Sequence, residues 1–228
     1  MKKVFIQGLG FVGSAMVTAV AASKDSENKP RYKVIGVDLN NEVGNERAIS
    51  INKGIFPLPT SDERLRKTLL QCQKEGNIEA TTEQNRFNEA DIIVVDIPLD
   101  IPFLEEKPIL KFEKFEEAIR NLGSQVKKDT LIIIETTVPP GTCEKIVIPA
   151  LEEELKKRNM SFGAASALIM LLIPLRNFQF TSTRMKANES QIIPAISRLL
   201  KLFVIRKVQI SVISDHQFLC WKHQPSYL

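Results

Sequence analysis

The sequence contains few of the residues that build disulfide-linked, metal-binding or membrane-spanning proteins. Only three of its 228 residues are cysteine and only two are histidine, and Cys72, Cys143 and Cys220 are far apart. An odd, scattered set of cysteines fits neither a disulfide framework nor a Cys-x-x-Cys metal site, and it is typical of a reducing compartment. The longest apolar run, residues 164–175, is well below the roughly 20 residues that a spanning helix needs. We therefore expect a cytoplasmic protein with no targeting segment and no membrane partner.

The sequence also lacks a strong excess of charge of one sign. It has 31 Lys and Arg against 27 Asp and Glu, a formal net charge of +4, which is too small to indicate a nucleic acid or an anionic membrane as a partner. Charged residues at 25% and hydrophobic residues at 43% are ordinary for a globular protein and exclude disorder, collagen and coiled coil. The length allows one large domain, or one domain and a fragment. We expect a small-molecule partner.

The charges are distributed unevenly along the chain. Residues 1–160 contain 23 basic and 25 acidic residues, whereas residues 161–228 contain 8 basic residues and only two acidic ones, Glu189 and Asp215. We therefore divide the chain into a domain, residues 1–160, and an atypical tail, residues 161–228. The pattern fits a helix over residues 192–205 and a strand over 208–213, but it assigns the tail no fold.

Before that boundary, short apolar runs alternate with helical stretches. Strands are expected at residues 3–7, 33–38, 78–80, 92–97 and 131–135, and most are rich in Val and Ile without polar alternation, as in strands buried on both faces. Helices are expected at residues 14–22, 61–75 and 144–158, the second opening with Thr60 and Glu63 spaced as a capping box. This order predicts an α/β fold: a Rossmann-like, doubly wound, mainly parallel sheet with helices on both faces.

The segment directly after the first strand, residues 8–13, has the spacing GxGxxG and opens a helix. Gly8 would allow the tight turn, Gly10 would let the backbone approach a pyrophosphate, and Gly13 would let helix and strand pack closely. The N–H groups at the helix start, around Phe11 and Val12, would face the phosphates. The ordered context of strand, motif and helix predicts dinucleotide binding.

The second strand ends in Asp38, where a carboxylate accepts hydrogen bonds from the adenosine ribose hydroxyls. The next residues, Leu39, Asn40 and Asn41, provide no arginine for a 2′-phosphate, so we expect NAD and not NADP. The alternative for both motifs is an ordinary glycine turn and a solvated acid.

A Thr- and Pro-rich segment, residues 135–142, follows the last strong strand and lies where that strand opens onto the crevice of the sheet. Prolines would hold its threonine hydroxyls in place. From the residues alone, two interpretations stay open: a catalytic loop, or a strand-to-helix turn with Thr142 as helix N-cap.

Taken together, these segments resemble the N-terminal domain of the UDP-glucose/GDP-mannose (nucleotide-sugar) dehydrogenase family. The resemblance covers about residues 1–158, and segment 135–142 is its most specific part. The matching segments are residues 8–13, 37–38, 52–54 with Pro57, 90–93, 135–142 and 144–147.

The resemblance implies that the intact enzyme oxidises the C6 alcohol of a sugar nucleotide to a carboxylate with two NAD⁺, through a cysteine-bound intermediate. It implies that Thr137 helps to position the catalytic water. The residues implied to bind NAD are Gly8, Gly10, Phe11, Val12, Gly13, Asp38 and Thr137.

The chain departs from the family pattern in several places. Leu99 replaces a threonine that contacts the cofactor, and Asp96 interrupts an apolar strand, where we expect a solvated side chain. Beyond Met160 the family's Pro-Glu-Arg segment, its central helix with Lys and Asn, and its glycine-rich cysteine segment are not found. Neither Cys143 nor Cys220 has the setting of the nucleophile, and we interpret both as packed or partly exposed thiols.

A metal site is not expected. His216, Cys220 and His223 have a spacing that would place three ligands on one helical face, but no carboxylate completes the set, and scattered polar residues are the better interpretation.

The sequence therefore predicts the NAD-binding domain of a nucleotide-sugar 6-dehydrogenase without its catalytic-cysteine half, inactive by itself. A UDP-sugar would be a partner only if that half is present, and no oligomeric state follows. The alternative is a non-catalytic NAD(H)-binding module. We hypothesise that residues from about Ser161 onward are a frameshifted or truncated remnant, since motif and charge pattern end together there.

Overall fold

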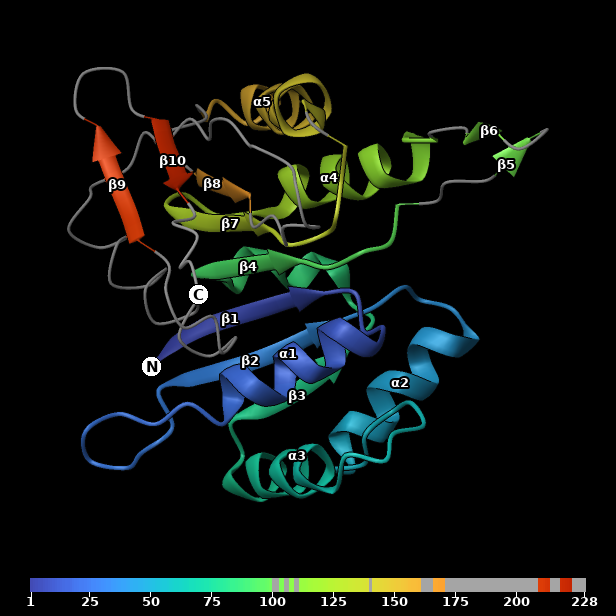
Figure 1. The fold of residues 1–228 in the computed structure, drawn as a ribbon, viewed down its shortest axis with the longest axis vertical. Coiled ribbons are helices and arrows are strands. Elements are labelled where there is room, and N and C mark those ends of the chain that lie inside the picture. Colours follow the sequence, from blue (N-terminus) through green and yellow to red (C-terminus); the bar gives the residue numbers. More distant parts are fainter. Residues whose placement is uncertain are drawn as a thin grey trace, which may run out of the picture.

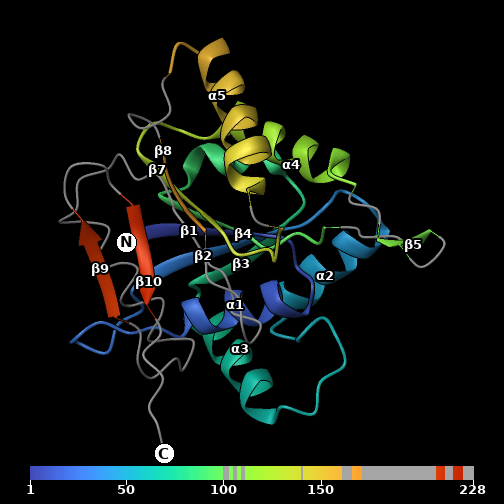
Figure 2. The same ribbon diagram turned by 45° about the horizontal axis from the view of Figure 1, so that its top comes forward.

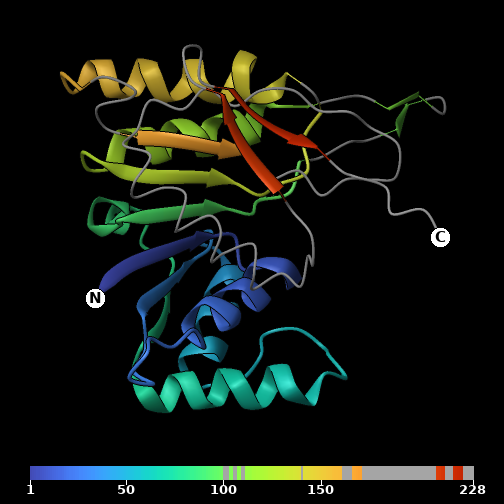
Figure 3. The same cartoon turned by 60° about the vertical axis from the view of Figure 1, so that its left-hand side comes forward.

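A six-stranded parallel sheet with helices on both faces forms the fold (Figure 1). The computed structural model describes residues 1–99, 103–104, 107–108, 111–139, 141–160, 166–170, 209–213 and 218–222. The strand order is β3-β2-β1-β4-β7-β8, and the strand arrows of this sheet run in one direction (Figure 3). Its strands are β1 (Lys2–Gln7), β2 (Tyr32–Val37), β3 (Ile78–Thr81), β4 (Ile92–Val95), β7 (Thr130–Ile134) and β8 (Ser166–Met170).

The helices form two layers, one on each side of the sheet (Figure 2). One layer has α1 (Phe11–Ala21), α2 (Glu42–Asn52) and α3 (Glu63–Glu75), and the other has α4 (Glu113–Gln125) and α5 (Ile148–Lys157). A 3-10 helix, Gln84–Glu89, precedes β4, and a π-helical turn, Cys143–Val147, leads into α5. The predicted doubly wound α/β fold is confirmed.

Strand alternation explains why both faces of the sheet are covered. In β1, Val4 and Ile6 pack into the core under α1 and α3, whereas Phe5 between them packs into the core under α4 and α5. All three side chains are at most 2% exposed. Uninterrupted runs of Val and Ile are therefore required here, because each face needs apolar residues.

The expected strands are confirmed, with an earlier carboxyl end at three of them. β2 ends at Val37, so Asp38 lies just beyond it. β4 ends at Val95 and β7 at Ile134, so Asp96, Ile97 and Glu135 lie beyond the strands to which the sequence pattern assigns them. This difference matters for the site, because it puts two carboxyl groups at the edge where the strands open.

The expected capping box at α3 is wrong. The N-cap is Asp62, whose carboxylate accepts a hydrogen bond from the Leu65 N–H at 3.0 Å. The Thr60 hydroxyl instead accepts from the Asp62 N–H at 3.1 Å. Asp is at least as good an N-cap as Thr, and Asp62 directly precedes the first helical residue, Glu63.

Strands also occur after Met160. β8 pairs in parallel with β7, from Thr130 with Ser166 to Ile134 with Met170. The sheet therefore includes a strand that follows α5 in the chain. β9 (Gln209–Ile213) and β10 (Phe218–Lys222) form an antiparallel pair, and β9 confirms the strand expected at 208–213. The helix expected at 192–205 lies outside the described residues. A second antiparallel pair, β5 (Phe103–Leu104) and β6 (Lys107–Pro108), precedes α4. Among the helices of the described part of the chain, none is long and apolar enough to cross a membrane.

Candidate dinucleotide site

The glycine turn after β1 has no room for side chains at two of its three glycines. Gly8 has φ +99°, and a Cβ there would lie 2.2 Å from the Asp96 carbonyl oxygen. A Cβ on Gly13 would lie 1.9 Å from the Gly8 carbonyl oxygen. The turn therefore packs directly on the end of β4, and the first turn of α1 packs directly on the turn.

Gly10 differs from the other two, because a Cβ there would meet nothing within 4 Å. It is the N-cap of α1, no side chain caps the helix, and the first turn has no acidic residue. Phe11 and Val12, the first two helical residues, are 51% and 47% exposed. The first N–H groups of a helix have no partner inside the helix. An open approach to such a helix end suits a pyrophosphate.

Asp38, at the carboxyl end of β2, is fixed by three donors. Its Oδ1 accepts from the Leu39 N–H at 2.8 Å, and its Oδ2 accepts from the Leu9 N–H at 3.3 Å. The third donor is the Arg47 guanidinium, whose Nη1 lies 3.2 Å from Oδ2. The carboxylate is 10% exposed and lies against the glycine turn.

The presence of Arg47 corrects the expectation that no arginine neighbours Asp38. The residues directly after Asp38 contain none, but Asn41 caps α2 by accepting from the Gly44 N–H at 2.8 Å, and α2 then carries Arg47 back to the carboxylate. The signal in the sequence was an N-cap asparagine followed by an arginine in the second helical turn.

Asp96 and Glu135 come together at the carboxyl ends of two adjacent strands. Val95 pairs with Ile134 in the parallel register, so the next residue on each strand continues that register. The Glu135 N–H donates to the Val95 carbonyl at 2.9 Å, and the Asp96 N–H donates to the Gln7 carbonyl at 2.8 Å. Both side chains lie on the α1 side of the sheet, like Val94 and Ile133 two residues before them.

The two carboxyl groups interact with each other in a poorly hydrated place. Glu135 is 5% exposed and Asp96 is half-buried. Burial first, and then the charge and the hydrogen bond of Asp96, together raise the pKa of Glu135 to about 8. Burial also raises the pKa of Asp96, although its hydrogen bond with Glu135 lowers it in part. Asp96 is therefore not the solvated acid that the sequence suggested.

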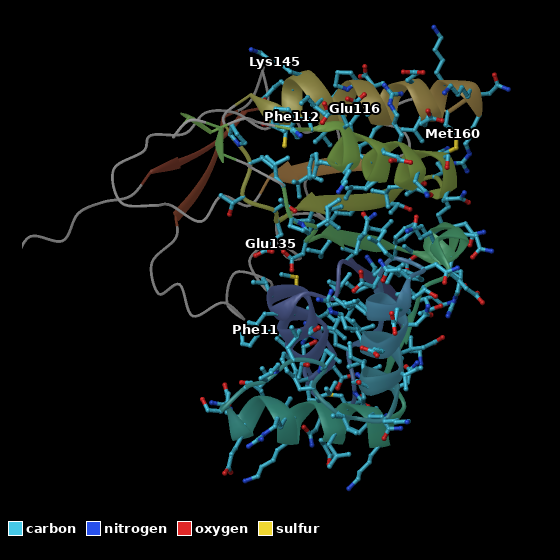
Figure 4. All side chains as sticks on the ribbon, turned by 90° about the vertical axis from the view of Figure 1, so that its right-hand side faces the viewer. Phe11, Phe112, Glu116, Glu135, Lys145 and Met160 are labelled. Atoms are coloured by element: carbon cyan, nitrogen blue, oxygen red, sulfur yellow. The ribbon has the colours of Figure 1, made fainter. Side chains whose placement is uncertain are left out.

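Figure 4 shows Glu135 at the same end of the molecule as Phe11, with Met160 at the opposite end. The Asp96 carboxyl group lies next to both Glu135 and the start of α1, because its Oδ2 would lie 3.0 Å from a Cβ on Gly13. The carboxyl pair therefore lies beneath the N-terminus of α1, next to the glycine turn.

In the loop after β7 the threonines have different roles. The Thr136 hydroxyl donates to the Ile97 carbonyl at 2.7 Å, which ties this loop to the end of β4. Thr142 occupies the N-cap position of the Cys143–Val147 turn, as the second interpretation predicts, but its hydroxyl donates to the Pro139 carbonyl at 2.7 Å and makes no cap hydrogen bond to the helix. Thr137 is exposed, and the replacement residue Leu99 packs against the core under α4 and α5.

The thiols of the described side chains are buried. Cys143 is 4% exposed, and burial, with the charge of Glu144, raises its pKa to about 12. Cys72 is 2% exposed, and burial raises its pKa as well. The packed-thiol interpretation of Cys143 is confirmed.

Cys220 lies in strand β10, so the helical spacing considered for a metal site does not apply to it, and His216 and His223 lie outside the described residues. Within the described residues, no group of three or more His, Cys, Asp and Glu side chains is placed to hold a metal ion.

Comparison with known proteins identifies an NAD-binding domain in this chain. Residues 2–168 match the NAD-binding domain of the UDP-glucose/GDP-mannose dehydrogenase family. A UDP-N-acetyl-D-mannosamine dehydrogenase from Methanococcus aeolicus is 31% identical over 64% of this chain and 30% of its own length. One of the same name from Campylobacter jejuni is 27% identical over 92% of this chain and 47% of its own length.

The fold agrees with a solved structure as well. The crystal structure of an NDP-N-acetyl-D-galactosaminuronic acid dehydrogenase from Methanosarcina mazei Go1 superposes with a TM-score of 0.63 and 27% identity, over 76% of this chain and 35% of that one. The chain thus spans about a third of the length of several proteins that it resembles.

Proposed function

Since the chain belongs to the UDP-glucose/GDP-mannose dehydrogenase family, we propose that it serves as the NAD-binding half of a nucleotide-sugar 6-dehydrogenase. The intact enzyme would oxidise the C6 alcohol of a UDP-sugar to a carboxylate with two NAD⁺. The observation that carries the proposal is the open helix start at Gly10, between two glycines that have no room for a side chain. Bound NAD⁺ supplies the nicotinamide that accepts the hydride.

The glycine turn and Asp38 fit two different parts of the dinucleotide. The backbone of Gly10, Phe11 and Val12 would bind the pyrophosphate, because this helix start is uncapped and free of acidic residues in its first turn. Asp38 would accept hydrogen bonds from the ribose hydroxyls, since three donors already hold its carboxylate in place. Gly8 and Gly13 shape the turn.

The loop after β7 would serve the chemistry. We assign to Thr137 the positioning of the catalytic water, supported by its exposure on this loop. We expect the nucleophilic thiol to come from a further part of the enzyme. The pKa of Cys143 is about 12, so its thiol stays protonated near neutral pH, and Cys220 lacks the glycine-rich surroundings of the family nucleophile.

That buried thiol also favours a second candidate, an NAD(H)-binding module that does no chemistry. The two candidates differ in one observable: only the first predicts NADH formation from a UDP-sugar when a catalytic half of this family is supplied.

Binding is tested by calorimetric titration of the full chain with NAD⁺, with Gly10→Val as the decisive variant. Its side chain has free space, so we expect the thermal unfolding midpoint to change little, while the branched side chain blocks the pyrophosphate and weakens NAD⁺ binding by at least about a hundredfold. Unchanged binding by Gly10→Val would contradict the proposed site.

A further inference from the structure

Asp96 touches both ends of the glycine turn. Its carbonyl oxygen lies under Gly8, where a Cβ would come within 2.2 Å, and its carboxyl Oδ2 lies against Gly13 in the first turn of α1. The carboxyl group is therefore held next to the helix end that the pyrophosphate would use. Any negative charge on it competes with the phosphates for the same helix dipole.

Asp96 and Glu135 directly follow Val95 and Ile134, which pair across adjacent strands, so their carboxyl groups are neighbours. A hydrogen bond between them requires a proton on one of them, since two carboxylates offer acceptors only. Two neighbouring carboxyl groups, one buried and one half-buried, do not both ionise easily, so the pair retains one proton and one charge. Among the described side chains, no lysine or arginine forms an ion pair with either residue. The proton is what relieves the repulsion inside the pair.

The neighbouring elements add little charge to this place. α1 has no ionisable side chain over its whole length, β4 and β7 contribute only uncharged residues, and β1 contributes Gln7 at this end. The Cys143 thiol packs on the other side of the sheet, and Glu144 and Lys145, in the same π-helical turn as Cys143, are exposed. The carboxylate of Asp38 contacts the glycine turn through the Leu9 N–H, and its charge is paired with Arg47.

We propose that Asp96 sets the charge of the dinucleotide site: it shares one proton with Glu135, and loss of this proton weakens pyrophosphate binding. With the proton, the pair has one negative charge beneath the helix end. Without it, a second charge lies there and repels the phosphates. The inference deepens the proposed NAD binding and rests on it.

The direction of the pH dependence follows from this geometry. Because NAD⁺ would bind better to the protonated pair, its Kd rises as pH rises through the titration of the pair, by up to about tenfold per pH unit. The pKa of Glu135, about 8, puts this rise in the weakly alkaline range.

The test is calorimetric titration of the full chain with NAD⁺ between about pH 6.5 and pH 9.5. Asp96→Asn keeps the shape of the side chain and leaves at most one charge on the pair. At the acidic limit we expect the variant to bind NAD⁺ with the wild-type Kd. At the alkaline limit its Kd should be unchanged, whereas the wild-type Kd should have risen at least about tenfold. Asp129→Asn is the matched control: Asp129 is exposed at the opposite end of β7 with φ +65°, which asparagine tolerates, and this variant should follow the wild type.

The outcomes distinguish failure of the shared proton from failure of the NAD site itself. If NAD⁺ binds and the wild-type Kd does not change with pH, or if Asp96→Asn shows the same rise, the inference is wrong and the proposed NAD site stands. If NAD⁺ does not bind even at about pH 6.5, the NAD site itself is wrong and the inference fails with it. Circular dichroism of each variant at both pH limits shows that folded proteins are compared.

Discussion

Arg47 binds the Asp38 carboxylate at 3.2 Å, so a guanidinium lies beside the acid that would contact the adenosine ribose. An acid at this position repels a 2′-phosphate, whereas an arginine accommodates one. Here the two are paired, and the carboxylate keeps two backbone donors besides. The chain should therefore prefer NAD⁺, by a smaller margin than Asp38 alone would give.

Substitutions of Asp38 and of Arg47 should change the affinities for NAD⁺ and NADP⁺ differently. Asp38→Ala should weaken NAD⁺ binding about tenfold, through lost hydrogen bonds to the ribose, and strengthen NADP⁺ binding. Arg47→Ala should weaken NADP⁺ binding and leave NAD⁺ binding within about threefold. Calorimetric titration measures both, with the exposed Arg64→Ala on α3 as control. Tighter NADP⁺ than NAD⁺ binding by the wild type would contradict the assignment of Asp38.

Gly13 should be far less tolerant of alanine than Gly10, although both belong to one motif. A Cβ at Gly13 meets the Gly8 backbone oxygen at 1.9 Å, whereas at Gly10 it meets nothing within 4 Å. We expect Gly13→Ala to lower the free energy of unfolding by about 3 kcal/mol or more, and Gly10→Ala to change it by less than about 0.5 kcal/mol. Urea denaturation measures this difference, and equal effects would show that the turn is not packed as described.

The strands could be predicted from the sequence because helices cover both faces of the sheet. Residues such as Val4, Phe5 and Ile6 must be apolar in succession when helices cover both faces, and that pattern is local in the sequence. The α3 start was mispredicted because Thr60 and Asp62 are both good caps, and only the packed helix decides between them.

The two long-range side-chain contacts of the site could not be predicted from such a local pattern. Arg47 reaches Asp38 through the path of α2, and Asp96 meets Glu135 through the pairing of β4 with β7. Each contact joins segments whose relation depends on three-dimensional packing. The strand order of a doubly wound sheet would have indicated the second one, since both acids directly follow adjacent strands.

Asp96 should reduce the stability of the fold at weakly alkaline pH. The pKa of Glu135 is about 8 in the folded protein, above its ordinary value of 4.5. The folded protein thus keeps a proton that the unfolded chain releases between these pH values, and the free energy of unfolding falls as pH rises through this range. Asp96→Asn removes the second carboxyl group and should raise the unfolding midpoint at about pH 8 by about 2–4 °C.

The same substitution should give little gain near pH 4.5, where the pair keeps its proton in the wild type as well. Scanning calorimetry at the two pH values gives both midpoints, and Asp129→Asn again serves as control. An equal gain at both pH values would attribute the effect to packing and not to the shared proton.

The isolated chain should not form NADH from a UDP-sugar. A four-electron oxidation of this type holds its aldehyde on a thiol, and the buried Cys143, with a pKa of about 12, is protonated near neutral pH. Absorbance of NADH after incubation with NAD⁺ and UDP-glucose or a UDP-N-acetylhexosamine is the readout. NADH formation that Cys143→Ser or Cys220→Ser abolishes would show that one of these thiols is the nucleophile.

The last prediction concerns the sequence after the α5 helix. The family match continues to residue 168, and β8 joins the sheet at Ser166–Met170, while acidic residues almost disappear after Met160. A frameshift would end the family motifs and the charge pattern together, because out-of-frame translation retains neither.

A genuine divergent tail is the alternative, and the alignment over 92% of the chain with the Campylobacter jejuni relative favours it. Translating the other two frames of the gene past the codons for residues 160–170 separates the two. A Pro-Glu-Arg segment followed by a glycine-rich cysteine segment should appear in one frame if the tail arose by a frameshift. If neither frame contains them, the tail belongs to the protein as it evolved, and the catalytic thiol must be sought in Cys220 or in another chain.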